Sequence, residues 1–320
     1  MTVRLTPLPA ARYDEWSAAT RERLIRLRQD SGLRLGEDAV TQAGQYFTEL
    51  LPNGLDSTAS QVLLIADGDD ELGTLWLGAN AGRLFVIDLA LSVPPSTSQG
   101  DEIVAALQTI ATGEEASLIS IGLFRQDVEG HRLVDGRGFR VASIQMLLEP
   151  LPDREVAPHV VVAPMTVERY PSFADTSEAA FAVDLATSGR YSPEEAAVES
   201  RRQFLQELPQ GLDTPGQEIF TATVDGVEVG ILWIGMRERG GRPHAFILDI
   251  EVAADQRRKG YGRELMHATE REARRLGAGS IGLHVFGFND AAVTLYEQLG
   301  YRRLEEQFVL DVGDAARAGS

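Results

Sequence analysis

The chain contains two copies of one sequence plan, and this duplication limits its fold more than any other feature. Residues 47–57 (FTELLPNGLDS) match residues 204–214 (FLQELPQGLDT) at an offset of 157, and residues 72–79 match residues 229–236 at the same offset. The segments FVIDLAL and FILDIEV follow in both copies with four residues of drift. The matches keep their order, and the period is far longer than that of a solenoid repeat. We therefore expect two tandem domains of one fold.

A proline-rich segment separates the two copies. Prolines stand at positions 150, 152, 158 and 164, which indicates a short, stiff connection rather than a flexible one. We predict a first domain at residues 1–150, a linker at 151–163 and a second domain at 164–320. The short linker also favours two domains that pack together.

Both copies mix helical and strand periodicity, which predicts an α+β (mixed α/β) fold class for each domain. In the first copy we expect helices at 13–29, 36–51 and 101–111, and strands at 62–66, 71–77, 83–91, 118–124 and 143–148. In the second copy we expect helices at 172–186, 193–207, 262–276 and 290–299, and strands at 218–224, 227–236, 245–252, 280–286 and 305–311.

Composition excludes several classes of function. The net charge of −18, with neither half basic, argues against nucleic acid as a partner. No apolar run approaches the ~20 residues that span a bilayer, and the N-terminus has no signal-peptide core, so we expect a cytoplasmic protein without a membrane partner. The chain has no cysteine, and its five histidines show no metal-binding spacing, so we expect no metal.

The stretch 245–301 carries the chemistry. An apolar strand leads into the basic turn Gln-Arg-Arg-Lys-Gly-Tyr-Gly at 256–262, and an amphipathic helix follows. Free backbone amides at a helix start bind anions, and glycines let phosphate oxygens approach the backbone closely. The turn therefore predicts a phosphate site.

These residues resemble the GCN5-related N-acetyltransferase (GNAT) superfamily, which transfers acyl groups from coenzyme A to amines. Arg257, Gly260 and Gly262 fit the motif [Q/R]-x-x-G-x-[G/A], and Asn289 with the run LYEQLGY at 295–301 resembles the closing motif. The resemblance implies two tandem GNAT domains, each a curved mixed sheet flanked by helices, with splayed central strands that admit the pantetheine arm.

The resemblance also implies roles for individual residues. The backbones of Ile250 and Val252 would pair with pantetheine, and Asn289 would bind pantetheine or the local turn. Tyr296 would contact the cofactor and protonate the leaving thiolate, because a phenol keeps its proton at neutral pH. The pyrophosphate would be cradled by amides from Arg257, Arg258, Lys259, Gly260, Tyr261, Gly262 and Arg263.

Three residues are candidates for the base that the amine requires. Glu251 and Asp249 lie two apart on one strand and so share a face, and His284 lies on the next strand. His284 could equally be a packing residue beside Phe286, and the two carboxylates could be a solvated strand face. We keep all three as alternatives.

The first copy lacks the phosphate-site residues. Its turn at 92–101 contains two prolines and no basic residue, and Ser98 replaces the first motif glycine. Asp127 stands near the Asn289 position and Val134 near the Tyr296 position. We therefore predict a degenerate, non-catalytic first domain.

The function that follows is transfer of an acetyl group from acetyl-CoA, as co-substrate, to a primary amine of a small cationic acceptor in a ternary complex. An acidic surface would attract such an acceptor. Two alternatives remain open, namely an acetyltransferase like the mycothiol synthases, which share the tandem arrangement, and a non-catalytic acyl-CoA sensor or scaffold.

Overall fold

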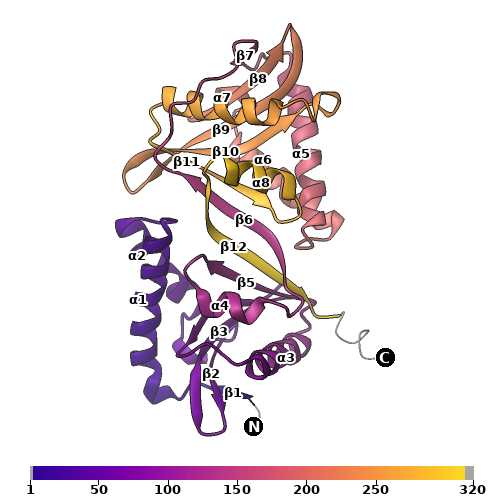
Figure 1. Cartoon of the computed structure of the whole chain (residues 1–320). Helices are drawn as coiled ribbons and strands as arrows, with labels where there is room; N and C mark the ends of the chain where they lie inside the picture. The colour runs from indigo at the N-terminus through magenta and orange to yellow at the C-terminus, as the bar shows by residue number, and fades with distance from the viewer. Residues whose placement is uncertain (1–2, 314–320) are drawn as a thin grey trace. The chain divides into compact units, whose positions relative to one another are not determined.

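The computed structural model describes residues 3–313 (Figure 1) and divides into two compact units. The first unit comprises Met1–Ala142 and Leu304–Ser320, and the second comprises Ser143–Arg303. These limits differ from the expected boundary at 151–163. The difference arises because the last strand of each sequence copy belongs to the unit of the other copy.

Strand pairing shows this exchange. The strand β6 (Arg140–Leu148) pairs antiparallel with β11 (Ser280–Phe286) of the second unit, from Ser143 opposite Phe286 to Leu148 opposite Ile281. The final strand β12 (Arg302–Asp311) pairs with β5 (Leu118–Phe124) of the first unit. Alternation of apolar residues predicts a strand but carries no information about its partner, so the exchange was not expected.

The first unit is a mixed sheet with strand order β1-β2-β3-β4-β5-β12, in which only β4 and β5 run parallel. Its other strands are β1 (Val3–Pro7), β2 (Ser60–Asp67), β3 (Asp70–Asn80) and β4 (Arg83–Leu91). Its helices are α1 (Tyr13–Ser31), α2 (Gly36–Leu50), α3 (Thr97–Gly113) and α4 (Val128–Val134). The strand β1 and the helix α4 were not expected from the sequence.

Two apolar clusters cover the two faces of this sheet. On one face Trp16 and Phe47 from α1 and α2 pack against Trp76 of β3. On the other face Ile103 and Leu107 of α3 join the neighbouring strand residues. Adjacent residues of a strand point to opposite faces, which is why neighbouring residues of β3 enter different clusters.

The second unit repeats this plan with strand order β6-β11-β10-β9-β8-β7, in which only β10 and β11 run parallel. The expected α+β class is thus confirmed. Its other strands are β7 (Val160–Pro164), β8 (Gln217–Val224), β9 (Val227–Arg239) and β10 (Arg242–Val252). Its helices are α5 (Tyr170–Thr187), α6 (Pro193–Glu207), α7 (Tyr261–Arg275) and α8 (Asp290–Gln298).

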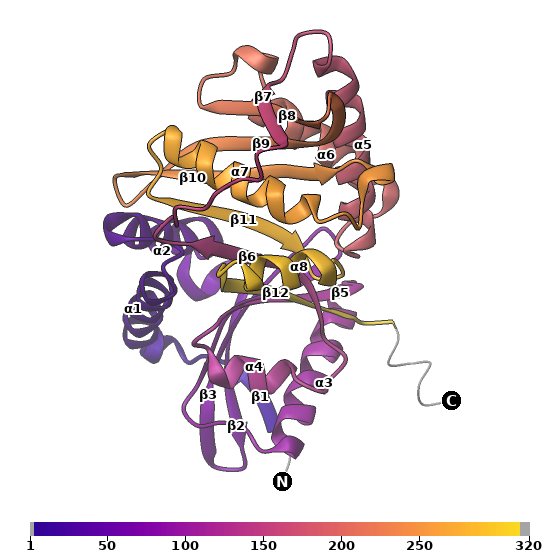
Figure 2. The same cartoon turned by 45° about the horizontal axis from the view of Figure 1, so that its top comes forward.

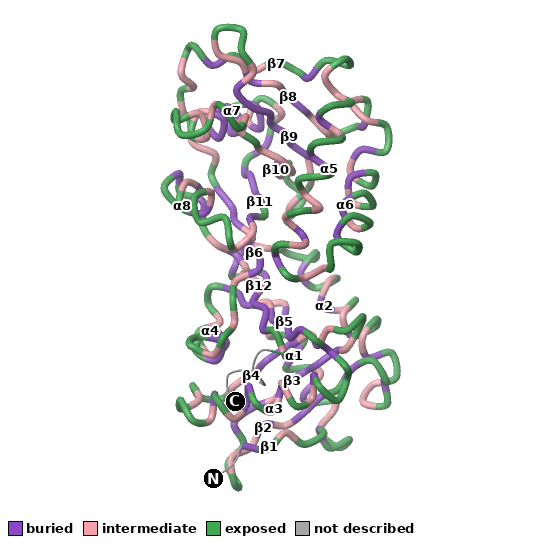
Figure 3. The backbone as a smooth tube through the Cα atoms, turned by 90° about the vertical axis from the view of Figure 1, so that its right-hand side faces the viewer, coloured by how far each residue is buried: buried purple, intermediate pink, exposed green. Residues whose placement is uncertain are grey.

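The helices of the second unit also lie on both faces of its sheet. Phe173 of α5 and Phe204 of α6 pack on Trp233 of β9. Figure 2 shows α7 lying across β9 and β10, and Figure 3 shows the buried residues concentrated along the central strands. The short 3₁₀ turn Ala254–Gln256 connects β10 to the segment before α7.

The expected linker forms a hydrogen bond and an ion pair with the second unit. The N–H of Ala157 donates to Glu264 of α7 at 2.8 Å, and Arg274 of α7 forms a 2.6 Å ion pair with Asp153. The segment then forms the edge strand β7, which begins inside the expected linker. These contacts make the segment part of the second unit rather than a free connection.

One glycine sets how closely β9 approaches β10. A Cβ at Gly230 would lie 2.2 Å from the carbonyl oxygen of Glu251, and a Cβ at Gly73 in the first unit would lie 2.0 Å from that of Ala90. We expect Gly230→Ala to destabilise the second unit by about 2–4 kcal/mol, because backbone must shift. Chemical denaturation measures this cost, with Gly279→Ala as the control because its Cβ meets nothing within 4 Å. An equal cost in both variants would contradict the close-approach account.

Candidate active site

The sheet of the second unit opens between its two parallel strands. Register between β10 and β11 runs only from His244 opposite Ser280 to Ile247 opposite Leu283. Beyond Ile247, β10 continues along β9 alone, and β11 continues along β6. In the described residues, the carboxyl half of β10 therefore pairs with β9 only. Its backbone groups on the β11 side have no strand partner. This is the splay that the family resemblance implies.

A β-bulge decides which side chains face the opening. The register of β10 on β9 shifts between Ile247 and Asp249, which leaves Leu248 as the extra residue. Asp249 is thereby placed opposite Trp233 and shares a face with Phe246, which lies opposite Gly235. Without the bulge, simple alternation would put Asp249 and Phe246 on opposite faces.

The turn before α7 has the geometry of an anion cradle. Gly260 caps the helix with a φ of 88°, in the left-handed region that favours glycine, and Arg258 also has a positive φ of 64°. The first-turn amides of a helix have no intrahelical acceptor, and the helix dipole adds positive charge there. A Cβ at Gly260 would meet nothing within 4 Å, so space lies over the backbone at this point. These residues fit a pyrophosphate.

The basic side chains of the turn are exposed, and their hydrogen bonds and ion pairs lie at the surface. Arg257 donates to the carbonyl of Val252 at 3.2 Å and to the carboxylate of Glu251 at 3.4 Å. Lys259 donates to Gln256, and Arg263 to Gln298 at 2.8 Å. Exposed pairs of this kind contribute little to stability, so these cations can turn toward an anionic ligand at small cost.

Tyr296 and Asn289 come from α8. Tyr296 is buried, and desolvation together with the negative charge of Asp249 raises the pKa of its phenol to about 12. The Asp249 carboxylate therefore acts electrostatically on the phenol. Asn289 caps α8, where its side-chain oxygen accepts from the N–H of Ala292 at 3.2 Å. Asn289 therefore orders the local turn, one of its two expected roles.

Asp249 is the most perturbed of the expected carboxylates. The Ser177 hydroxyl on α5 donates to it at 2.6 Å. Desolvation nevertheless raises the pKa of Asp249 to about 6, with Glu251 and Asp184 raising it further. The pKa of Asp184, also on α5, is raised by desolvation and by Glu251. Sequence reasoning missed Ser177 and Asp184, since nothing in a helical pattern marks the residues that face a distant strand.

His284 lies on the same face of the sheet as Phe246, and their rings meet edge to face with centroids 5.5 Å apart. Crowding by protein and the positive charge of Arg190 lower the pKa of His284 to about 4. The side chain is also solvent-exposed. Water at the exposed ring makes the desolvation partial. His284 is thus a neutral imidazole at neutral pH.

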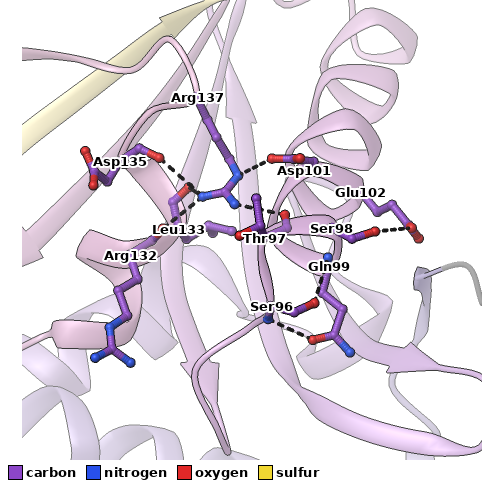
Figure 4. A network of polar contacts seen from close by, with 10 residues as sticks. All are labelled: Ser96, Thr97, Ser98, Gln99, Asp101, Glu102, Arg132, Leu133, Asp135 and Arg137. Carbon is purple, nitrogen blue, oxygen red and sulfur yellow. Dashed lines mark hydrogen bonds and ion pairs between the residues drawn. The ribbon is translucent and has the colours of Figure 1, made fainter.

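The first unit has a different arrangement at the corresponding turn. There α3 begins after Ser96, whose side chain forms a capping box with Gln99. Figure 4 shows Arg137 reaching this helix start, where it donates to the Asp101 carboxylate at 2.7 Å and to the Thr97 carbonyl at 3.0 Å. A Cβ at Gly100 would lie 2.5 Å from the Arg137 guanidinium. At Gly262, the matching glycine of the second unit, a Cβ would meet nothing closer than 3.5 Å.

Comparison with known proteins agrees with this geometry. The family model described as Acetyltransferase (GNAT) family matches residues 183–301. An uncharacterized N-acetyltransferase of Bacillus subtilis, YycN, is 31% identical over 147 residues, covering 46% of this chain and 94% of that protein. The mycothiol acetyltransferase of Propionibacterium freudenreichii is 31% identical over 116 residues, 35% of each chain. A GCN5-related N-acetyltransferase structure from Sphaerobacter thermophilus matches in fold with a TM-score of 0.52 and 15% identity, over 97% of this chain and 96% of that one.

The chain is thus an acetyltransferase of the kind that uses acyl-CoA as donor. It belongs to the GNAT family, as the match over nearly the whole of YycN shows. The fold of the whole chain matches that of the Sphaerobacter thermophilus structure, and its two units share one strand order.

Residues 3–313 lack two kinds of feature. No helix in that range is long and apolar enough to cross a membrane. No group of three or more acidic or histidine side chains in that range is arranged to hold a metal ion.

Proposed function

We propose that the second unit transfers an acetyl group from acetyl-CoA to a primary amine of a small, cationic acceptor in a ternary complex, and that the first unit is non-catalytic. One observation carries the proposal. The open helix start at Gly260, a protonated Tyr296 and the carboxylate of Asp249 all belong to the elements that border the opening between β10 and β11.

The cofactor residues divide into two groups. Backbone groups of Ile250 and Val252 lie on the part of β10 that extends past the β11 pairing, where they can bind amide groups of an extended ligand. Amides from Arg257 to Arg263 hold the phosphates. Bound acetyl-CoA supplies an activated thioester, and the protein supplies its orientation.

Tyr296 is suited to act as a general acid. A phenol whose pKa is about 12 keeps its proton at neutral pH and can donate it to a leaving thiolate. Its burial excludes water that would otherwise compete for that proton.

Among the three candidate bases, the geometry favours Asp249. Its pKa of about 6 lies near neutral pH, where a base is both ionised and basic enough to accept a proton. Glu251 is exposed and paired with Arg257, which ties it to the cofactor turn. His284 is the second choice, because its lowered pKa makes it a weaker base.

The acceptor surface combines acidic and aromatic groups. Asp249, Glu251 and Asp184 interact electrostatically on the side of the sheet that α5 covers. On that side Phe181 of α5 contacts Phe286, and Phe286 stacks on Phe288. An amine with an apolar or aromatic body fits this chemistry.

The pH profile of kcat/KM tests the base. If Asp249 is the base, activity rises with pH through about 6. Ser177→Ala removes a hydrogen bond that lowers this pKa, so we expect the rise to move to higher pH. Glu251→Gln removes a charge that raises it, so we expect the rise to move to lower pH. Ser172→Ala, an exposed serine on the same helix, should leave the midpoint unchanged.

The same experiment separates the alternatives. Loss of the rise in Glu251→Gln would assign the base to Glu251. A midpoint far below pH 6 that disappears in His284→Ala would assign it to His284.

Turnover with a panel of polyamines, arylalkylamines, aminoglycosides, amino acids and peptides tests the enzymatic role. The mycothiol precursor amine belongs in this panel because of the partial similarity to the mycothiol acetyltransferase. Thiol release with at least one amine supports the proposal. Tight acetyl-CoA binding without thiol release for any amine would instead favour a sensor.

A further inference from the structure

The first unit contains a cavity of about 630 Å³. It lies where β4 and β5 diverge, since their parallel register ends at Val86 opposite Ile121. All its lining residues belong to the first unit, with walls from α1 and α2 and a contribution from β12. Its volume is in the range of small-molecule sites.

This cavity is the counterpart of the acceptor side of the second unit. A β-bulge between Val86 and Asp88 places Asp88 opposite Trp76, as the bulge in β10 places Asp249 opposite Trp233. The cofactor side differs, because Arg137 fills the start of α3. The first unit thus keeps an acceptor-like cavity, while the start of its α3 is occupied by the Arg137 side chain.

The two arginines of the cavity are already engaged. Arg23 lies 3.1 Å from the Asp88 carboxylate and 3.8 Å from that of Asp127, and it also donates to a backbone carbonyl. Arg28 donates to the Leu24 carbonyl at 3.0 Å and lies over the Tyr46 ring at 4.9 Å. Neither cation is left to hold an anionic ligand.

A third carboxylate, Glu305 of β12, forms no ion pair within 4 Å among residues 3–313. It accepts a 3.1 Å hydrogen bond from the neutral amide of Gln307. The Glu305 carboxylate lies over Gly122, where a Cβ would come within 2.7 Å of it. The equivalent positions of the second unit hold Ser143 and His284, as the matching registers show. Desolvation raises the pKa of Glu305, although the charges of Arg28 and Arg34 and the hydrogen bond from Gln307 act in the opposite direction.

We infer that this cavity binds a small organic amine, whose ammonium group pairs with Glu305 and whose apolar body lies against Phe85, Ile87 and Leu27. The lining contains three carboxylates and two guanidinium groups, which favours a cation. Because the first unit lacks a counterpart of the basic, glycine-containing turn at 256–262, the cavity is a second amine site that binds without acetylating. The inference concerns binding alone and does not require acetyl transfer by the second unit.

Isothermal titration of the full chain without acetyl-CoA tests the inference, with 2-phenylethylamine and tryptamine as probes and phenylacetate as the anionic control. An Asp249→Asn background weakens the acceptor site of the second unit, so that the cavity site is measured. In this background we expect one amine site and no phenylacetate binding. Adding Glu305→Gln should weaken amine binding about tenfold or more, because a charge-assisted contact is lost.

Two further variants keep the test decisive. Ser120→Phe places a ring in the cavity from β5 and should abolish amine binding, whereas Glu306→Gln, on the same strand but outside the lining, should leave it unchanged. Thermal melting confirms that each variant is folded. Amine affinity that is unchanged in both Glu305→Gln and Ser120→Phe, or no binding of either probe at millimolar concentration, would overturn the inference. Neither result would bear on acetyl transfer, which is followed separately by thiol release.

Discussion

Gly260→Asp is expected to lower acetyl-CoA affinity by about a hundredfold or more, because the new carboxylate would stand beside the pyrophosphate at the start of α7. The Cβ at Gly260 points into open space, so the loss would come from charge repulsion at the cradle rather than from a clash with protein. The side chain also brings backbone strain of about 1–2 kcal/mol, because Gly260 has a φ of +88°.

A matched control separates charge from strain. Gly277, at the other end of the same helix, has a φ of +89° and equally open space around its Cβ position. Gly277→Asp therefore introduces the same carboxylate and the same strain far from the cradle. We expect acetyl-CoA affinity, measured by titration calorimetry, to fall only in Gly260→Asp. Equal affinities in the two variants would remove the phosphate site from α7.

Tyr296→Phe is expected to reduce kcat by about 10²–10⁴-fold and to leave acetyl-CoA affinity nearly unchanged. The substitution keeps the buried ring that packs in α8 and removes only the phenolic proton. Since burial and Asp249 hold the phenol pKa at about 12, the wild-type group is fully protonated when the thiolate leaves.

Tyr301→Phe is the control for this prediction. Its ring is also buried and lies 5.9 Å from that of Tyr296, so both variants test the packing of one aromatic pair. Steady-state kinetics should show a large kcat loss in Tyr296→Phe alone. Full turnover in Tyr296→Phe would show that another group, or water, protonates the leaving thiolate.

The duplicated plan and the strand, turn and helix around Gly260 could be predicted from sequence because they depend on local signals. The matched segments around Trp76 and Trp233 are buried strand residues in both units, and Gly260 has the left-handed backbone that a glycine at a helix cap permits. Helix and strand periodicity likewise located most elements, since apolar spacing reflects which face is buried.

Non-local features could not be predicted in the same way. The exchange of β6 and β12 depends on which strand each of them pairs with, namely β11 for β6 and β5 for β12. The placement of Asp249 depends on a β-bulge at Leu248, and no residue type in the sequence predicts that bulge. Ser177 reaches Asp249 across 72 positions of sequence, so only the folded chain shows that it tunes the carboxylate.

The prediction for the first copy combined both kinds of information. The prolines and missing basic residues at 92–101 indicated a lost phosphate site. Arg137 adds a physical reason, because its guanidinium lies at the helix start and donates to Thr97 and Asp101. Its role was not visible in the sequence, since an arginine after a short helix has many possible partners.

The stoichiometry of acetyl-CoA binding tests the central claim most directly. The claim is that the chain contains two copies of the acyltransferase fold and that only the second copy binds acetyl-CoA. Titration calorimetry of the full chain should give one site per chain, and Gly260→Asp should remove it. Two sites per chain, or one site that persists in Gly260→Asp, would contradict the account.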